Sequence, residues 1–172
     1  MAKFKPLPPL EELQKVLSYD PETGVFVWAS KPSRKTVVGS VAGSIDSSTG
    51  YRRIRLKDVM WYAHRIAWYM QTGEDPRAFT VDHINRDRSD NRIQNLRLAT
   101  RPQQNLNTAI HSDNTSGFRG VTFHKQNKRW QAKLGINGKY KSLGLYDTRE
   151  EAAAVYREAA MAHYGEFVGD LT

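Results

Sequence analysis

The sequence predicts an α+β protein with two small domains, each built from short antiparallel strands and a helix. Three alternating runs with tight-turn signals lie in the last third: RGVTFHK, RWQAKLGI and KYKSLGLY. A strand, a polar loop, a second strand and a helix are predicted within residues 79–110. Between these patterns HSDNTSG, residues 111–117, has linker composition. We therefore expect domains over residues 1–112 and 113–172, a division that suits a chain of 172 residues.

The first domain begins with local elements that have clear sequence signals. LEELQKVLSYD has apolar residues at helical spacing, and residues 25–28 predict a short strand after the DPETG turn. Residues 31–50 have loop composition. YRRIRL predicts a strand with one basic, solvent-exposed face formed by Tyr51, Arg53 and Arg55. MWYAHRIAWYMQTG, residues 60–73, predicts a mostly buried helix closed by its final glycine.

The middle of the chain combines two predicted strands with a capped helix. Residues 79–83 form the first strand and residues 96–99 the second. Thr100 and Gln103 have the spacing of a capping box, which starts the helix. The apolar face of this helix is predicted to consist of Leu106, Ala109 and Ile110.

The second domain is predicted to be a three-stranded antiparallel sheet packed on one helix. Asn137 and Gly138 are the strongest local signal for a tight hairpin. Thr148 and Glu151 form a second capping box. The helix carries a stripe of small residues for packing on the sheet: Ala152, Val155, Ala159 and Ala162. We expect the other face of the sheet to be open and basic.

The charge distribution favours nucleic acid as the partner. Lys plus Arg number 26 against 18 acids, a net charge of +8. Residues 119–141 contain no acid, and residues 86–101 contain five Arg against two Asp. With no Cys, thiolate zinc sites and cysteine nucleophiles are excluded, and a metal would take hard ligands. No apolar run reaches about 18 residues and no signal peptide is evident, so we expect a soluble intracellular protein without a membrane partner.

The segment VDHINRDRSDNRIQNLRLAT could hydrolyse a phosphodiester. Such a reaction needs a base to deprotonate water and positive charge to stabilise the phosphorane and the leaving oxygen. His83 could be the base, Asp82 a metal ligand, and Asn95 the group that orients the imidazole. Neighbours in a regular strand point to opposite faces, so this pair can share a site only at a strand end or irregularity. The alternative is an ordinary polar turn in which Asn95 caps loop backbone.

DHIN followed by NRIQNLRLAT resembles the HNH nuclease motif of phage and intron-encoded endonucleases, which has a ββα-metal fold. The resemblance implies that Asp82 is a metal ligand, His83 the general base and Asn95 its supporting residue, with one divalent cation, Mg²⁺ or alternatively Mn²⁺. The third metal-site residue falls on Gln104 by ungapped spacing or on Asn105 after a slip of one position, and both stay open.

Further residues of the first domain follow from the same resemblance. AHRIAW also recurs in these endonucleases. His64 is interpreted as a histidine that packs the helix onto the sheet, and Arg65 is a candidate phosphate ligand. Arg86 and Arg88 are candidate DNA contacts in the basic loop.

Residues 115–169 resemble the plant ethylene-response-factor (APETALA-type) DNA-binding domain, whose three-stranded sheet lies in the major groove. RGV, the Trp130 and Ala132 pair, and LGLYDTREEAA carry the resemblance. The base-reading set departs from the plant pattern, so the plant target does not transfer. Trp130 and Tyr146 are interpreted as core residues. The implied DNA contacts are Arg119, Thr122, His124, Lys125, Lys128, Arg129, Lys133, Lys139 and Lys141.

Together these observations predict a metal-dependent endonuclease that nicks or cuts duplex DNA and is anchored by its C-terminal sheet. The resemblance implies a phage-encoded protein acting in the host bacterial cytoplasm, and a monomer is favoured. One alternative is a decayed HNH protein that acts as a DNA-binding or packaging factor. Another is a ribonuclease that uses the same basic surface.

Overall fold

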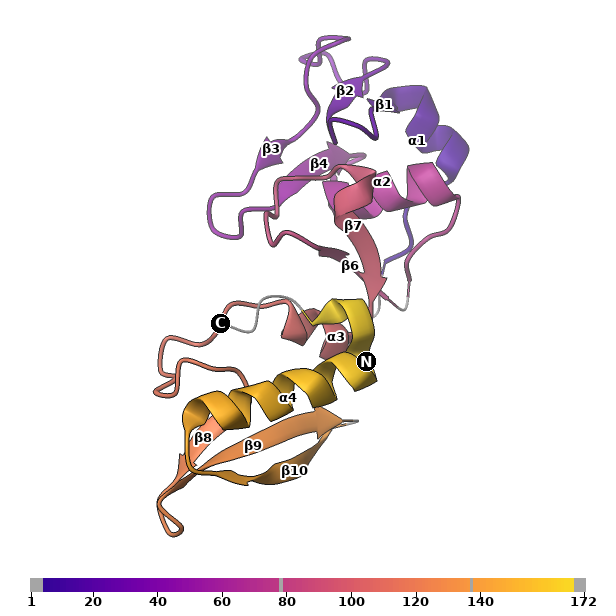
Figure 1. Ribbon diagram of the computed structural model, residues 1–172. Helices are drawn as coiled ribbons and strands as arrows, with labels where there is room; N and C mark the ends of the chain where they lie inside the picture. The colour runs from indigo at the N-terminus through magenta and orange to yellow at the C-terminus, as the bar shows by residue number, and fades with distance from the viewer. Residues whose placement is uncertain (1–4, 78, 137, 169–172) are drawn as a thin grey trace. The chain divides into compact units, whose positions relative to one another are not determined.

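The computed structural model describes residues 5–77, 79–136 and 138–168, and its contacts divide the chain into two compact units (Figure 1). The first unit is Met1–Ala99 and the second is Thr100–Thr172. The division falls before the helix that follows the second middle strand, whereas the boundary expected from the sequence follows that helix. The mixed helix and strand content agrees with the predicted α+β class.

The first unit is a set of small antiparallel sheets held together by two helices. Its elements are α1 (Leu10–Val16), β1 (Leu17–Tyr19), β2 (Phe26–Trp28), β3 (Ser44–Ile45), β4 (Arg52–Leu56), β5 (Val59–Tyr62), α2 (Ala63–Thr72), β6 (Thr80–His83), the short 3₁₀ helix η1 (Ile93–Asn95) and β7 (Leu96–Ala99). The pairings are β1 with β2, β3–β4–β5, and β6 with β7. The core between them includes Leu13, Leu17, Phe26, Ile54, Trp61, Ile66 and Val81, all buried.

The helix expected over residues 60–73 was wrong in its first turn. Val59–Tyr62 is instead strand β5, which pairs with β4 and places Trp61 opposite Ile54, both in the core. Lys57 and Asp58 make this possible, because both adopt positive φ (46° and 61°), as a two-residue hairpin turn requires. The helix then starts at Ala63 and ends at Gly73, whose left-handed conformation confirms the predicted C-terminal stop.

The strands of the middle segment pair as predicted. β6 and β7 are antiparallel, and the regular register ends where His83 lies opposite Leu96. The following helix α3 (Arg101–Leu106) has the predicted Thr100 capping box but is shorter than expected. Ala109 and Ile110 therefore lie beyond the helix, and only Leu106 of the predicted apolar face is buried within it.

The second unit confirms the predicted sheet and helix. Its strands are β8 (Val121–His124), β9 (Arg129–Ile136) and β10 (Lys139–Tyr146), in the order β10–β9–β8. Helix α4 (Arg149–Tyr164), followed by the 3₁₀ turn η2 (Gly165–Phe167), lies along one face of this sheet (Figure 1). The predicted Thr148 capping box is present. Trp130 and Tyr146 pack against the core, as expected.

The helix face that meets the sheet differs from the predicted stripe. Its buried residues are Ala152, Ala153, Tyr156 and Ala160, whereas Ala162 is exposed. The shift occurs because a large residue joins the small ones on this face. The ring of Tyr156 packs against Gly120, where an added Cβ would lie 2.2 Å from the ring. Gly120 has φ 69°, so glycine is needed for both space and backbone conformation.

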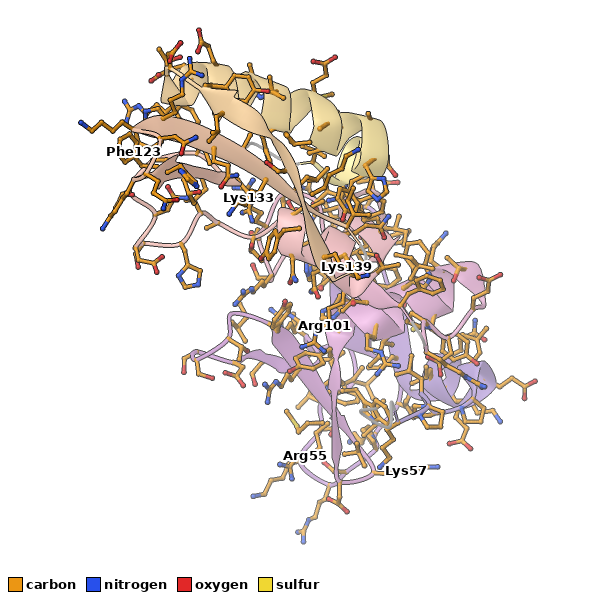
Figure 2. All side chains as sticks on the ribbon, turned by 90° about the horizontal axis from the view of Figure 1, so that it is seen from below. Arg55, Lys57, Arg101, Phe123, Lys133 and Lys139 are labelled. Atoms are coloured by element: carbon orange, nitrogen blue, oxygen red, sulfur yellow. The ribbon has the colours of Figure 1, made fainter. Side chains whose placement is uncertain are left out.

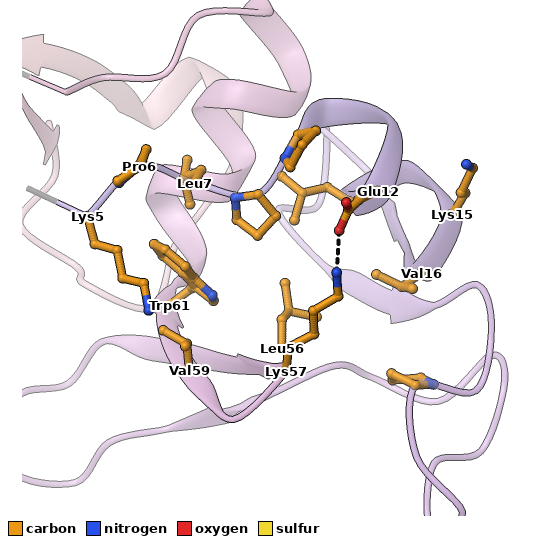
Figure 3. Close-up of a pocket in the computed structure, with 14 residues that line it drawn as sticks. Lys5, Pro6, Leu7, Glu12, Lys15, Val16, Leu56, Lys57, Val59 and Trp61 are labelled. Atoms are coloured by element: carbon orange, nitrogen blue, oxygen red, sulfur yellow. Dashed lines mark hydrogen bonds and ion pairs between the residues drawn. The ribbon is translucent and has the colours of Figure 1, made fainter.

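A groove of about 700 Å³ in the first unit lies between α1 and the β4–β5 turn (Figure 3). Leu7, Val16, Leu56 and Trp61 are among its apolar lining, and the Nζ of Lys57 meets the carboxylate of Glu12 at 2.6 Å at its rim. None of the site residues predicted from the sequence lines it. Within the described ranges, no helix is both long and apolar enough to cross a membrane.

Candidate active site and DNA-binding surface

Asp82 lies on β6, directly opposite Arg97 of β7. Nε and Nη2 of Arg97 each donate to Oδ2 of Asp82 at 3.2 Å, and both side chains are about one-tenth exposed. The cross-strand register explains the contact, since directly opposed residues project from the same face of a hairpin. The carboxylate predicted to bind metal therefore has a guanidinium on one of its two oxygens.

His83 is the last residue of β6 and is 3% exposed. Its Nε2 lies 3.3 Å from Oδ1 of Asn91, a long hydrogen bond. Nδ2 of Asn91 donates to the carbonyl of Ser89, which fixes the amide so that its oxygen faces the imidazole. Because an amide oxygen only accepts, Nε2 carries the proton and Nδ1 holds the lone pair of the neutral ring. Burial lowers the pKa of His83 below its usual value, which favours that neutral ring at pH 7.

Asn91 was not predicted from the sequence, and distant elements hold it in place. It is 1% exposed, and its backbone carbonyl accepts a 2.7 Å hydrogen bond from the hydroxyl of Tyr19. Gly24 of the DPETG turn packs so closely that a Cβ there would lie 2.5 Å from the backbone nitrogen of Arg92. This turn therefore buttresses the residue that contacts His83. Such a contact between distant segments has no local sequence signal.

Asn95 organises the loop between β6 and β7. Its Oδ1 accepts from the backbone N–H of Asn85 at 3.0 Å, and its Nδ2 donates to the carbonyl of Asp90 at 2.8 Å. Its own carbonyl accepts from the N–H of Ile84 at 2.9 Å. These bonds cap loop backbone, which is the alternative role that the sequence allows for Asn95. The amide that accepts from Nε2 of His83 belongs to Asn91, so Asn95 would act on the imidazole only through the loop that carries Asn91.

Histidine and tyrosine rings surround His83. The ring of His64 meets it edge-on with centroids 5.0 Å apart, and Tyr51 lies at 5.8 Å. His64 itself stacks on Tyr62 at 5.3 Å. It is 6% exposed, and burial lowers its pKa to about 3, so it stays neutral. Its Nδ1 is buried without a hydrogen-bond partner. His64 does pack between helix and sheet, as interpreted, but the sequence did not indicate its contact with His83.

The chain offers a limited donor set for the predicted divalent cation. Among the described residues no three His, Cys, Asp or Glu side chains gather as a metal cluster. Asp82 supplies a carboxylate, the hard ligand that Mg²⁺ prefers, and Mg²⁺ is commonly bound through one or two carboxylates with waters and substrate phosphates. The donor chemistry therefore fits Mg²⁺ or Mn²⁺ bound together with DNA. Gln104 and Asn105 belong to α3 in the second unit, and their place in a metal site stays a prediction.

The predicted DNA contacts of the first unit differ in accessibility. Arg65 is mostly buried, and its Nη2 lies 3.2 Å from Oδ1 of Asp75. The guanidinium of Arg65 is therefore engaged in an internal ion pair and is not presented at the surface as a phosphate ligand. Arg86 and Arg88 are exposed on the loop after His83. Arg88 donates to the carbonyl of Thr49 at 2.9 Å and lies over the ring of Tyr51.

Side-chain alternation sorts the predicted contacts of the second unit. Val121, Ala132 and Leu134 face α4, so the alternate residues face the opposite side. On that open face lie Thr122, His124, Arg129 and Lys133. Lys125 and Lys128 are exposed in the β8–β9 turn.

The three remaining predicted contacts lie neither on the open face nor in the β8–β9 turn. Lys139 and Lys141 are opposite Ile136 and Leu134, and so emerge from the α4 side, where both are exposed. Arg119 is turned toward the end of α3, and its Nη1 donates to the carbonyl of Asn105 at 3.1 Å. It also donates to the carbonyl of Thr108, so it caps the backbone that follows the helix.

Two family models match separate parts of the chain. The HNH endonuclease family model matches residues 61–106, and the AP2 domain model matches residues 116–166. The β6–β7 hairpin lies within the first matched range, and the sheet of β8, β9 and β10 lies within the second. No solved structure matches the chain.

Individual relatives resemble the chain over parts of its length. Protein 3.8 of Escherichia phage T7 is 29% identical over 104 residues, which cover 60% of this chain and 85% of the relative. An uncharacterized HNH endonuclease of Acanthamoeba polyphaga mimivirus is 37% identical over 55% of this chain and 48% of its own length. An ethylene-responsive transcription factor of Arabidopsis thaliana is 46% identical over 31% of this chain and 13% of its own length.

Proposed function

We propose that this chain, which carries an HNH endonuclease domain followed by an AP2 domain, is a divalent-metal-dependent endonuclease of duplex DNA. The observation that carries the proposal is the buried, neutral His83 at the end of β6, with its Nε2 held by Asn91. A neutral imidazole held in one tautomer is what a general base needs. We infer a phage-type setting in a bacterial host from the resemblance to the phage protein.

In this mechanism His83 takes a proton from the attacking water at Nδ1, while Asn91 holds the ring at Nε2. The imidazolium that forms keeps both nitrogens as donors, so the bond to the Oδ1 of Asn91 persists through the proton transfer. His64 and Tyr51 restrict the water that reaches the ring from their sides. Asn95 keeps the loop closed behind it.

The metal would be held by Asp82, with Gln104 or Asn105 as the expected further residue. When bound, a divalent cation supplies positive charge to the phosphate and to the departing 3′ oxygen. Arg97 orients the carboxylate through its oxygen Oδ2.

We propose residues 1–112 as the nuclease domain and residues 113–172 as the DNA-binding domain. The open face of the second sheet would lie against duplex DNA through Arg129, Lys133 and their neighbours. Linking two binding modules raises the effective concentration of each on the DNA, so the sheet would hold the nuclease near its substrate. We propose a monomer as the acting species.

The first experiment is cleavage of supercoiled plasmid in Mg²⁺ or Mn²⁺ by the full chain and by His83→Ala. We expect wild type to cleave and the variant to lose at least about 100-fold in rate. His111→Ala is the matched control, because that histidine is 90% exposed and outside the site. Equal cleavage by all three proteins would contradict His83 as the base. Comparing Gln104→Ala with Asn105→Ala at saturating metal then identifies the third metal-site residue.

The second candidate is a decayed HNH protein that only binds DNA, which the Arg97 contact on the predicted metal ligand favours. It predicts tight duplex binding without cleavage in either metal. Competition between duplex DNA and RNA of equal length tests the ribonuclease alternative. Preference for RNA would contradict our interpretation of the second sheet.

A further inference from the structure

One face of the β4–β5 hairpin carries two tyrosine–arginine pairs. Arg53 of β4 and Tyr62 of β5 are directly opposite in the register, and they lie on the face away from the buried Ile54 and Trp61. The guanidinium of Arg53 lies 5.0 Å from the centroid of the Tyr62 ring and donates to its hydroxyl at 3.3 Å. This fixes the arginine in a defined position before any ligand is bound.

The second pair joins the hairpin to the loop after His83. Arg88 lies 5.1 Å from the centroid of Tyr51, and its Nη1 bonds the carbonyl of Thr49. The rings of Tyr51 and Tyr62 are themselves only 5.3 Å apart, so the two pairs form one surface. We call Tyr51, Arg53, Tyr62 and Arg88 the Tyr–Arg patch.

The patch adjoins the candidate base. Tyr51 lies 5.8 Å from the ring of His83, and both tyrosines contact His64, which packs on His83. Whatever binds the patch is therefore held next to the imidazole. Among the described residues none forms a hydrogen bond with the hydroxyl of Tyr51, and burial raises the pKa of this group, so it remains a neutral hydroxyl that can donate.

The charges of the patch suit a polyanion. Asp46 meets Arg53 at 3.1 Å and neutralises part of its charge. Among the described residues no carboxylate forms an ion pair with Arg88, whose charge is met only by a carbonyl and a ring. Arg55 projects from the same hairpin face toward the tip and is exposed (Figure 2). Guanidinium groups already held on aromatic rings can bind phosphate without the usual loss of side-chain freedom.

We propose that the Tyr–Arg patch binds the phosphodiester backbone of the DNA strand beside the cleaved bond, with Arg88 and Arg53 each contacting one phosphate. This inference rests on the proposed function, and it names the substrate-binding surface of that same site. The two tyrosines hold the guanidinium groups in place and deliver the strand to His83.

The test measures the salt dependence of DNA binding rather than cleavage. Fluorescence anisotropy of a labelled 30-base-pair duplex would be recorded with the full chain in EDTA between 50 and 200 mM salt. The slope is that of the logarithm of the binding constant against the logarithm of the salt concentration. Loss of one phosphate contact lowers the magnitude of this slope by about 0.9, so the affinity lost between 50 and 200 mM salt becomes roughly 3.5-fold smaller. We expect that change for Arg88→Gln and about twice that change when Arg53→Gln is added.

The matched control is Lys57→Gln, which removes a positive charge from the turn of the same hairpin, where the ammonium bonds Glu12. It should leave the slope unchanged. Arg88→Lys should also keep the slope, since the charge is retained. The exposed Arg88 is the deciding position, because its loss should not unfold the hairpin, as the thermal midpoint would verify.

The outcomes separate the two proposals. A slope for Arg88→Gln equal to that of wild type and Lys57→Gln would overturn the patch as a phosphate-binding surface, whether or not the protein cleaves DNA. Absence of cleavage by wild type in Mg²⁺ and Mn²⁺, with the slope change present, would leave the patch and refute the nuclease. If the wild type does cleave, Arg88→Gln should show a higher KM for DNA than the Lys57→Gln control.

Discussion

Burial of His64 should make the first unit less stable in mild acid. Burial lowers the pKa of this histidine from 6.5 to about 3, with the neighbouring His83 and Arg65 adding to the effect. Above pH 6.5 the ring is neutral in both the folded and the unfolded chain, so it has no effect on stability. As pH falls below 6.5 only the unfolded chain binds the proton, and stability is lost until the folded-state pKa is reached.

The size of the loss follows from the two pKa values. At pH 5 the unfolded histidine is almost fully protonated and the folded one is not, which gives about 2 kcal/mol relative to pH 8. Urea unfolding at both pH values, followed by tryptophan fluorescence, measures it. Three of the four tryptophans, Trp28, Trp61 and Trp68, report on the first unit. For a urea dependence of about 2 kcal/mol per molar, the midpoint should fall by about 1 M.

His64→Phe is the informative variant, because it keeps a ring in the cluster and removes the titrating group. Carboxylates and His83 contribute to the pH dependence of both proteins, so only the difference between them is assigned to His64. We expect the variant to lose about 2 kcal/mol less than wild type between pH 8 and pH 5. Equal losses in the two proteins would refute the reasoning, since the buried neutral ring would then have no energetic cost.

Three further predictions follow from the site. Arg97→Met should cost about 3 kcal/mol in unfolding free energy without metal, because it removes the cation at Oδ2 of Asp82; Mg²⁺ should recover part of it, and no recovery would count against metal binding there. Asn91→Ala should reduce the cleavage rate about 100-fold with about 1–3 kcal/mol of destabilisation, and an unchanged rate in single-turnover assays would remove it from the mechanism. Gly24→Ala should lower the thermal midpoint, since the new Cβ would lie 2.5 Å from the nitrogen of Arg92 and φ is 72°; an unchanged midpoint would show that the turn is not needed as a buttress.

Local sequence signals predicted the elements of this protein better than their boundaries. Both capping boxes and the left-handed stop at Gly73 are present, since each depends on residues a few positions apart. The first turn of the helix expected over residues 60–73 is a strand because pairing with β4 outweighs helical periodicity there. Strand β4 has a local alternation signal, but its pairing with residues 59–62 has none.

In the candidate site too, residues with a local sequence signal could be predicted and residues placed by distant contacts could not. Asp82 and His83 could be identified as chemistry-bearing residues from their motif. Arg97 could have been found by extending the predicted hairpin register, since it is the residue opposite Asp82. Asn91 could not, because its position depends on Tyr19 and on the turn at Gly24, which lie about seventy residues away.

The contact between Arg97 and Asp82 changes what metal binding means for this protein. For the cation that we propose at Asp82, binding becomes an exchange, in which the incoming ion competes with a guanidinium already in place. The apparent binding free energy of the cation is then its own interaction with Asp82 minus the free energy of breaking the Arg97–Asp82 ion pair. It depends on the new contacts of the displaced Arg97 side chain as much as on the ligands of the ion. The displaced guanidinium would become a mobile positive charge at the moment when a DNA phosphate arrives. In the absence of metal, the guanidinium of Arg97 would then serve as the cation that partners Asp82.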